Sequence, residues 1–296
     1  MASIARTSGA PATLFSITEP EFLRFRALVH AETGIALGDS KRQMVCSRRG
    51  RRLRFWGYTT FAEYWTHLRK ADPNGEELGR LINAITTNKT DFFREAHHFE
   101  CLRSTVLPEL AARSGPRRLR IWSAGCSTGQ EAYSIAVTVL GALARPGAWD
   151  ARILASDIDT DVLATAKAGV YAAGDTTSVP TAVTGRLFEA SGQGGTVRVR
   201  DEVRRLVVFR RINLRTEPWP IRTLFDCIFC RNVVIYFDKD LQTRLVSRLM
   251  DYLQPGGYLF LGHSESLLGL RSGFRHVANT VYRKPGASDD GARRTS

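Results

Sequence analysis

Two stretches of the chain carry residue types suited to binding a nucleoside. The first is Arg118 to Glu131, RLRIWSAGCSTGQE, in which an apolar run stops at a turn of small residues and helix formers follow. A strand–turn–helix junction of this kind lets a ligand approach bare backbone at Gly125, with helix N–H groups facing it. The second is Asp157, an acid directly after the predicted strand Arg152 to Ser156. An acid at the end of a second strand is placed to hold a ribose diol.

The glycine-containing turn alone does not decide between a ligand site and an ordinary strand-to-helix turn. It lacks the G-x-G-x-x-G spacing of dinucleotide sites, and Asp157 follows Gly129 by 28 residues, where roughly 20 is usual for those folds. The turn and the acid together favour a nucleoside ligand.

A polar connection precedes the turn in sequence. Residues 86–95, TTNKTDFFRE, carry more side-chain hydrogen-bonding groups than a simple linker needs. One interpretation is a capping turn from Thr90 to Phe93. The other is that Asn88, Thr90 and Arg94 fold back over the bound ligand.

Histidine and cysteine patterns do not indicate a metal site. His97, His98 and His263 lack metal-ligand spacing with a carboxylate or cysteine partner, so we expect no metal. Cys227 and Cys230 lie three apart on a predicted strand and point to opposite faces, so we interpret both as packing residues.

The elements around these residues predict an open α/β sheet domain preceded by a small all-helical domain. We expect residues 15–87 to form an all-helical domain, 88–98 a linker that contributes to the site, and 99–284 the α/β domain. A small antiparallel β-subdomain is expected at 186–209, and its last strand re-enters the main sheet. Disorder is expected at 1–14 and 285–296.

Charge and composition limit the class of protein. The 296 residues are 43% hydrophobic and 24% charged, and no apolar run is long enough to span a bilayer. Five cysteines and no secretory signal favour the cytoplasm.

The net charge of +13 indicates an anionic partner. A predicted helix from Ser40 to Phe55 carries seven Lys and Arg residues and no acid, which favours a docking surface over a merely solvated face.

Together these motifs resemble the CheR-type chemotaxis receptor methyltransferases over about residues 15–284. The resemblance rests on five stretches: TTNKTDFFREAHHF, IWSAGCSTGQEAYSIA, ASDIDTDVLATA, CRNVVIYF and LQPGGYLFLGHSESL. It implies a helical N-terminal domain, a Rossmann-like S-adenosylmethionine-dependent domain with an inserted β-subdomain, and methyl transfer to glutamates on the signalling helices of chemoreceptors.

The resemblance also implies roles for individual residues. Arg94 and Tyr236 match residues beside the transferred methyl, and the docking surface is expected at Arg48, Arg49, Arg51 and Arg52. The β-subdomain matches one that in some members binds a receptor C-terminal pentapeptide. The product would be S-adenosylhomocysteine, and a monomer is expected. The implied cofactor contacts are Asn88, Thr90, Arg94, Gly125, Glu131, Asp157, Asn213, Leu214, Arg231 and Asn232.

Two other functions stay open at this point. The basic charge is compatible with a nucleic-acid methyltransferase, although Arg231-Asn232-Val233-Val234 lacks the Asn/Asp-Pro-Pro-aromatic motif of enzymes that methylate base amines. A non-catalytic module that senses S-adenosylmethionine is the second alternative. We expect no nucleic-acid partner and no membrane insertion.

Overall fold

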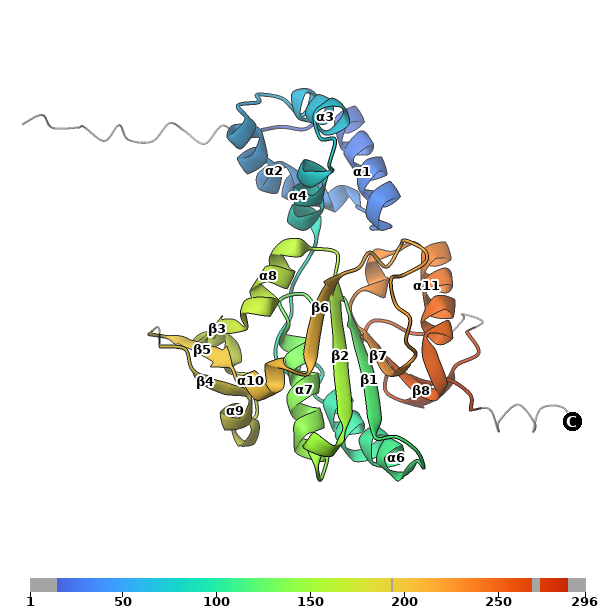
Figure 1. The fold of residues 1–296 in the computed structure, drawn as a ribbon. Coiled ribbons are helices and arrows are strands. Elements are labelled where there is room, and N and C mark those ends of the chain that lie inside the picture. The colour runs from blue at the N-terminus through green and yellow to red at the C-terminus, as the bar shows by residue number, and fades with distance from the viewer. Residues whose placement is uncertain (1–14, 193, 268–271, 287–296) are drawn as a thin grey trace, which may run out of the picture. The chain divides into compact units, whose positions relative to one another are not determined.

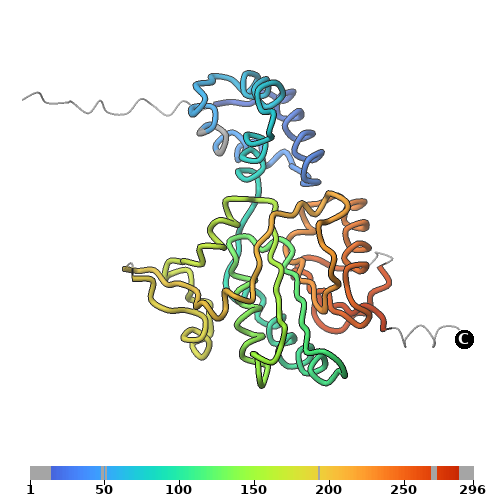
Figure 2. The backbone as a smooth tube through the Cα atoms, viewed as in Figure 1, coloured from blue at the N-terminus to red at the C-terminus, as the bar shows by residue number. Residues whose placement is uncertain are grey.

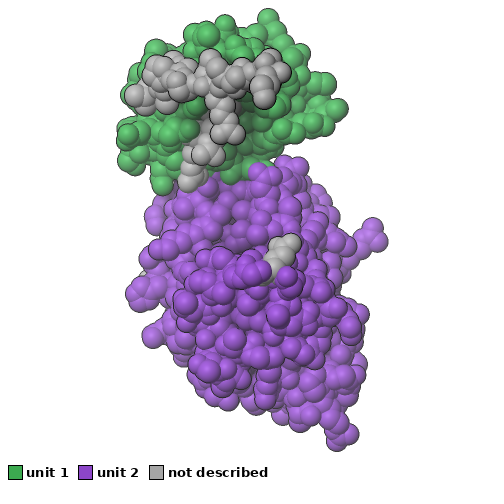
Figure 3. All heavy atoms as spheres, turned by 90° about the vertical axis from the view of Figure 1, so that its left-hand side faces the viewer, with its two compact units in different colours: residues 1–31, 37–85 green, residues 32–36, 86–296 purple. Residues whose placement is uncertain are grey.

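The computed structural model describes residues 15–192, 194–267 and 272–286, and for Arg48, Arg49 and Arg51 it describes the backbone alone. Of the segments expected to be disordered, 1–14 and 285–296, residues 1–14 and 287–296 lie outside the described residues. The chain forms two compact units, one of residues 1–31 and 37–85 and one of residues 32–36 and 86–296 (Figure 3). The tube in Figure 2 follows the chain from the first unit into the second.

The first unit is helical, as expected. Phe22, Phe25, Phe61 and Tyr64 are fully buried in it. Thr60 forms a capping box with Glu63, which fixes the start of the third helix. The helices are α1 (Glu19–Thr33), α2 (Arg42–Trp56), α3 (Phe61–Lys70) and α4 (Glu76–Ile85), with a 3-10 turn at Asp39–Lys41 before α2.

The second unit is built on a seven-stranded sheet in the order β6-β2-β1-β7-β8-β10-β9 (Figure 1). The first five strands in this order are parallel, and β10 and β9 are antiparallel additions. The strands are β1 (Arg118–Ala124), β2 (Asp150–Asp157), β6 (Val207–Arg211), β7 (Phe225–Cys230), β8 (Leu253–Leu261), β9 (Arg275–Ala278) and β10 (Val281–Arg283). The last two strands, β9 and β10, form an antiparallel hairpin.

Helices cover both faces of this sheet, and each face has its own apolar core. Alternate strand residues enter different cores: Ile121 and Cys227 pack in one, and Trp122 and Cys230 in the other. Cys227 and Cys230 are therefore packing residues on opposite faces, as predicted, and both are free thiols. The covering helices are α5 (His97–Cys101), a π-helical segment Leu102–Val106, α6 (Leu107–Ala112), α7 (Gln130–Ala142), α8 (Thr160–Ala168) and α11 (Lys239–Asp251).

A separate three-stranded antiparallel sheet has the order β3-β5-β4. Its strands are β3 (Val170–Ala172), β4 (Phe188–Ala190) and β5 (Thr196–Val199), and α9 (Thr181–Leu187) lies between β3 and β4 in sequence. The subdomain therefore begins earlier than residue 186, because β3 pairs with β5. A three-residue strand is too short to show an apolar alternation. A short helix, α10 (Asp201–Arg204), lies between β5 and β6 in sequence.

None of the helices among the described residues is both long and apolar enough to cross a bilayer.

Candidate functional site

The turn after β1 holds a backbone shape that only small residues allow. Gly125 and Gly129 have φ values of 89° and 97°. A Cβ atom on Gly125 would lie 2.3 Å from Cγ2 of Val233, and one on Gly129 would lie 2.9 Å from Cβ of Ala166. The N–H groups of Gly125 and Cys126 donate to the carbonyl of Ser156 at 2.8 and 2.9 Å. The turn is thus fixed to the end of β2, and α7 begins directly after it.

Asp157 at the end of β2 is bonded to this turn. One carboxylate oxygen accepts the Ser127 N–H at 2.9 Å, and the other accepts the Asp159 N–H at 3.0 Å. Burial raises the pKa of Asp157, while these backbone donors act to lower it. The Ile158 N–H also acts on this carboxylate, and because a carboxylate has about four acceptor positions, it can still accept a ribose hydroxyl. The acid predicted to hold a ribose also shapes the turn beside it.

The connection that enters this unit is anchored beside the same turn. The Asn88 amide donates to the Asp159 carboxylate at 2.7 Å, and the Thr86 hydroxyl donates to it at 2.7 Å. Ser127 donates its hydroxyl proton to the Asn88 carbonyl at 2.9 Å. The structure therefore brings Asn88 to the predicted site, with its amide engaged in holding the connection.

Asp159 is a site residue that the sequence analysis missed. It is buried, and it caps α8 by accepting the N–H of Asp161. An acid two residues after a strand and just before a helix is a recognisable capping pattern. Its bond to Asn88, however, spans 71 residues of sequence and has no local signal.

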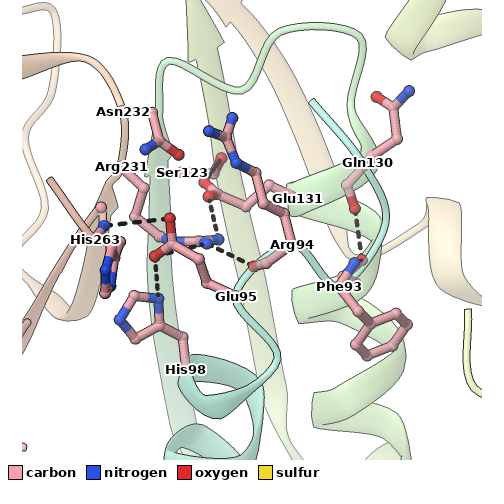
Figure 4. A network of polar contacts seen from close by, with 12 residues as sticks. Phe93, Arg94, Glu95, His98, Ser123, Gln130, Glu131, Arg231, Asn232 and His263 are labelled. Carbon is pink, nitrogen blue, oxygen red and sulfur yellow. Dashed lines mark hydrogen bonds and ion pairs between the residues drawn. The ribbon is translucent and has the colours of Figure 1, made fainter. Parts of the chain in front are cut away.

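Arg94 lies on a strained part of the connection. Its neighbours Phe93 and Glu95 have φ values of 52° and 57°, which costs on the order of 1–3 kcal/mol each and is typical of functional segments. The Arg94 guanidinium donates to the Lys89 carbonyl at 3.0 Å. Figure 4 shows this side chain apart from the ion pairs of Arg231. Its charge therefore remains available to a ligand.

Arg231, directly after β7, is the centre of a buried ion-pair network (Figure 4). Its side chain is 2% exposed and lies 3.0 Å from the Glu131 carboxylate and 3.3 Å from that of Glu95. It also donates to the Arg94 carbonyl at 2.5 Å, and Ser123 donates to Glu131 at 2.7 Å. The network joins the start of α7, the end of β7 and the connection carrying Arg94.

The network gives a structural role to two residues that were predicted to contact the cofactor, Glu131 and Arg231. The charged groups of Glu131 and Arg231 bind each other, so they position the turn and the connection. Burial acts to raise the pKa of Glu95, but the Arg231 guanidinium and the His263 N–H outweigh it, and the pKa lies below its usual value. Direct contacts of Glu131 and Arg231 with the cofactor stay predictions.

One cluster among the described residues could in principle hold a metal: Glu95, His97 and His98, whose ligand atoms lie within 4.8 Å of one another. Burial lowers the pKa of His98 to about 3, so its imidazole is neutral, which is the form that a metal ligand requires and does not itself exclude a metal. The positive guanidinium of Arg231 already occupies the Glu95 carboxylate. We therefore keep the prediction that no metal binds.

Most of the remaining predicted residues follow strands of the same sheet, and Thr90 lies on the connection. Asn213 and Leu214 follow β6, and the Asn213 amide donates to the Glu32 carbonyl at 2.7 Å. Asn232 follows β7 with a φ of 57°, and Tyr236 ends the 3-10 turn Val234–Tyr236 and is half-buried. Thr90 is half-buried on the connection. Their contacts with a cofactor stay predictions.

Some basic side chains of helix α2 are paired with acids on other helices, although the helix itself contains no acid. Arg52 donates to the Glu77 carboxylate at 2.9 Å, and the Tyr64 hydroxyl donates to the same group at 2.7 Å. Arg42 forms an ion pair with Glu19. Two of the seven charges of the basic segment are therefore paired with acids on other helices, and the docking surface stays a prediction. The side chains of Arg48, Arg49 and Arg51 lie outside the described residues.

The fold and the site together define a class of protein. A mostly parallel sheet whose strand order reverses beside β1 places ligands at the carboxyl ends of the strands. There the glycine turn leaves no room for a Cβ, and an acid with free acceptor positions stands at the end of β2. These features fit the adenosyl group of S-adenosylmethionine and define a Rossmann-like methyltransferase.

Comparison with known proteins gives the family. Residues 88–283 match the family described as "CheR methyltransferase, SAM binding domain", and residues 20–86 match "CheR methyltransferase, all-alpha domain". The chain belongs to the CheR methyltransferase family and uses S-adenosylmethionine as its methyl donor.

Curated relatives support this family membership over nearly the whole length of the chain. The chain is 45% identical to chemotaxis protein methyltransferase 2 of Pseudomonas aeruginosa over 273 residues, covering 90% of this chain and 94% of the relative. It is 42% identical to the chemotaxis protein methyltransferase of Salmonella typhimurium and 41% identical to that of Escherichia coli, each covering 90% of this chain and 91% of the relative. The chain is therefore a methyltransferase of chemotaxis.

Proposed function

We propose that this protein methylates glutamate side chains on the cytoplasmic signalling helices of chemoreceptors, forming glutamate methyl esters. The observation that carries the proposal is the match of both units to one family whose curated relatives are chemotaxis protein methyltransferases. The proposed setting is the cytoplasm, and the proposed active form is a monomer.

The side chains of the site suit a reaction that needs little proton transfer. When bound, S-adenosylmethionine supplies a methyl group that its positive sulfur already activates. A glutamate carboxylate is ionised at neutral pH, so no general base is required. The task of the protein is to align the carboxylate oxygen with the methyl carbon and to exclude water.

Two residues are proposed to do this alignment. Arg94 offers a guanidinium that matches the planar shape of a carboxylate, and it would hold either the substrate carboxylate or that of the methionine moiety. Tyr236 would orient the attacking oxygen or line the path of the methyl group. The fixed backbone positions of Arg94 and Asn232, set by the Arg231 network and the turn after β7, support this arrangement.

Docking of the receptor is proposed at two places. The basic helix α2 would contact acidic receptor helices through Arg48, Arg49 and Arg51, while Arg52 pairs with Glu77 within its own unit. The three-stranded sheet is proposed to bind a receptor C-terminal pentapeptide.

The test is transfer of tritiated methyl from S-adenosylmethionine to membranes that contain chemoreceptors. We expect labelled receptor protein, with the label released as volatile methanol in alkali, as carboxyl esters are. Membranes lacking receptors are the matched control. Alkali-stable label on DNA or RNA would instead support the nucleic-acid methyltransferase, and binding without any transfer would support a sensing module.

A further inference from the structure

Glu265 is a buried carboxylate that the proposed reaction does not use. Its residue is 4% exposed, and among the described residues no cation forms an ion pair with it. Instead it accepts four backbone N–H groups. One oxygen binds those of Gly262 and Asn232 at 2.6 and 2.8 Å, and the other binds those of Val233 and Ile235 at 2.9 and 3.2 Å. Burial raises the pKa of Glu265, and these donors act to lower it.

The four donors belong to two turns that follow neighbouring parallel strands. Asn232, Val233 and Ile235 lie after β7, and Gly262 lies after β8, where Cys230 pairs with Leu261. Hydrogen bonds to a charged acceptor are about twice as strong as those between neutral groups. One side chain therefore joins both strand ends at the edge of the sheet where the cofactor binds.

The turn after β7 needs such support. Asn232 has a φ of 57°, a left-handed conformation that asparagine adopts more readily than most residues with a side chain but that its neighbours must still hold in place. A Cβ atom on Gly262 would lie 2.5 Å from the Asn232 amide nitrogen Nδ2, 2.8 Å from its backbone nitrogen, and 2.9 Å from the Glu265 carboxylate. The shape of the turn thus depends on both the carboxylate and the absence of a side chain at 262.

We propose that Glu265 is a positioning residue that holds the turn of residues 232–236, so that Asn232 and Tyr236 face the cofactor and the methyl group. The inference rests on the proposed function, which gives these two residues their roles. Both carboxylate oxygens are needed, because each accepts two N–H groups. A glutamine amide would turn an NH₂ group toward two donors, and the turn would have to move.

The test compares Glu265→Gln with a matched variant, Glu109→Gln. Glu109 on α6 binds the Tyr258 hydroxyl and Arg283, so it also anchors strands of this sheet, but it makes no contact with the 232–236 turn. Calorimetric titration with S-adenosylhomocysteine measures affinity, and methyl transfer to receptor membranes measures kcat and the receptor KM.

We expect Glu265→Gln to weaken S-adenosylhomocysteine binding by about 10-fold or more and to lower kcat by at least as much. An effect of this size corresponds to the loss of roughly one to two hydrogen bonds to a charged group. The receptor KM should change less than twofold, because docking lies elsewhere. Glu109→Gln should lower the melting temperature while leaving affinity and kcat within twofold of wild type.

A second variant, Gly262→Ala, displaces the same turn and keeps the carboxylate. It should reproduce the loss of affinity and of kcat. A folded Glu265→Gln protein with wild-type affinity and kcat would overturn the proposal, and so would failure of both variants to fold, which would make Glu265 purely structural. Failure of the proposed function has a different signature, since wild-type protein would then bind the cofactor and methylate no receptor.

Discussion

Replacing Arg231 with methionine is expected to lower the free energy of unfolding by about 3–5 kcal/mol, the usual cost of removing one partner from a buried ion pair. The guanidinium is 2% exposed and lies between Glu131 and Glu95, whose side chains are 11% and 14% exposed. Without it, two carboxylates stay near each other in a poorly hydrated place. Denaturant unfolding followed by circular dichroism measures the change.

The control for Arg231→Met is Arg103→Met. Arg103 pairs with Glu100 on the surface, where its side chain is 59% exposed, and surface pairs contribute little. Its loss should leave the unfolding midpoint close to that of wild type. Adding Glu131→Gln to Arg231→Met should restore part of the lost stability, because the uncompensated charge is removed. An Arg231→Met protein as stable as wild type would contradict the network.

Replacing Arg94 with alanine is expected to lower kcat by about 100-fold. The loss of one charged partner from a hydrogen-bonded carboxylate pair costs roughly 2–5 kcal/mol, and each 1.36 kcal/mol corresponds to about tenfold in rate. The guanidinium lies next to the network but outside its ion pairs, so stability should change little. Single-turnover methyl transfer at saturating S-adenosylmethionine measures the effect.

Arg94→Lys separates charge from shape at this position. The ammonium keeps the charge and loses the planar pair of donors, so we expect a rate between those of alanine and wild type. If the Arg94→Ala protein transfers methyl at the wild-type rate, Arg94 has no part in the reaction.

The strands and the turn of the site could be predicted because their signals are local. Ile121 and Trp122 belong to an apolar run, Gly125 and Gly129 follow at once, and Asp157 ends the next run. Thr60 and Asp238 each cap a helix by accepting an N–H from a residue less than four positions later in the sequence. Each of these features depends on backbone geometry that neighbouring residues determine.

The contacts that hold the site together could not be predicted in this way. Arg231 lies 100 residues from Glu131, and Glu265 binds N–H groups about 30 residues earlier. The sequence shows these charges but not their partners, because the partners meet only when the parallel strands align. For the same reason Arg52 was expected at a docking surface, whereas its partner Glu77 lies on another helix.

The central claim is that the turn after β1 and the acid at the end of β2 bind the adenosyl group of the methyl donor. Calorimetric titration of wild-type, Asp157→Asn and Asp157→Ala proteins with S-adenosylmethionine tests it most directly. We predict that Asp157→Ala weakens binding by about 10- to 100-fold, because it removes a hydrogen bond to a charged group. Asp157→Asn keeps an acceptor for the Ser127 N–H, so we predict that it weakens binding less. A folded Asp157→Ala protein that binds the cofactor as tightly as wild type would contradict the claim.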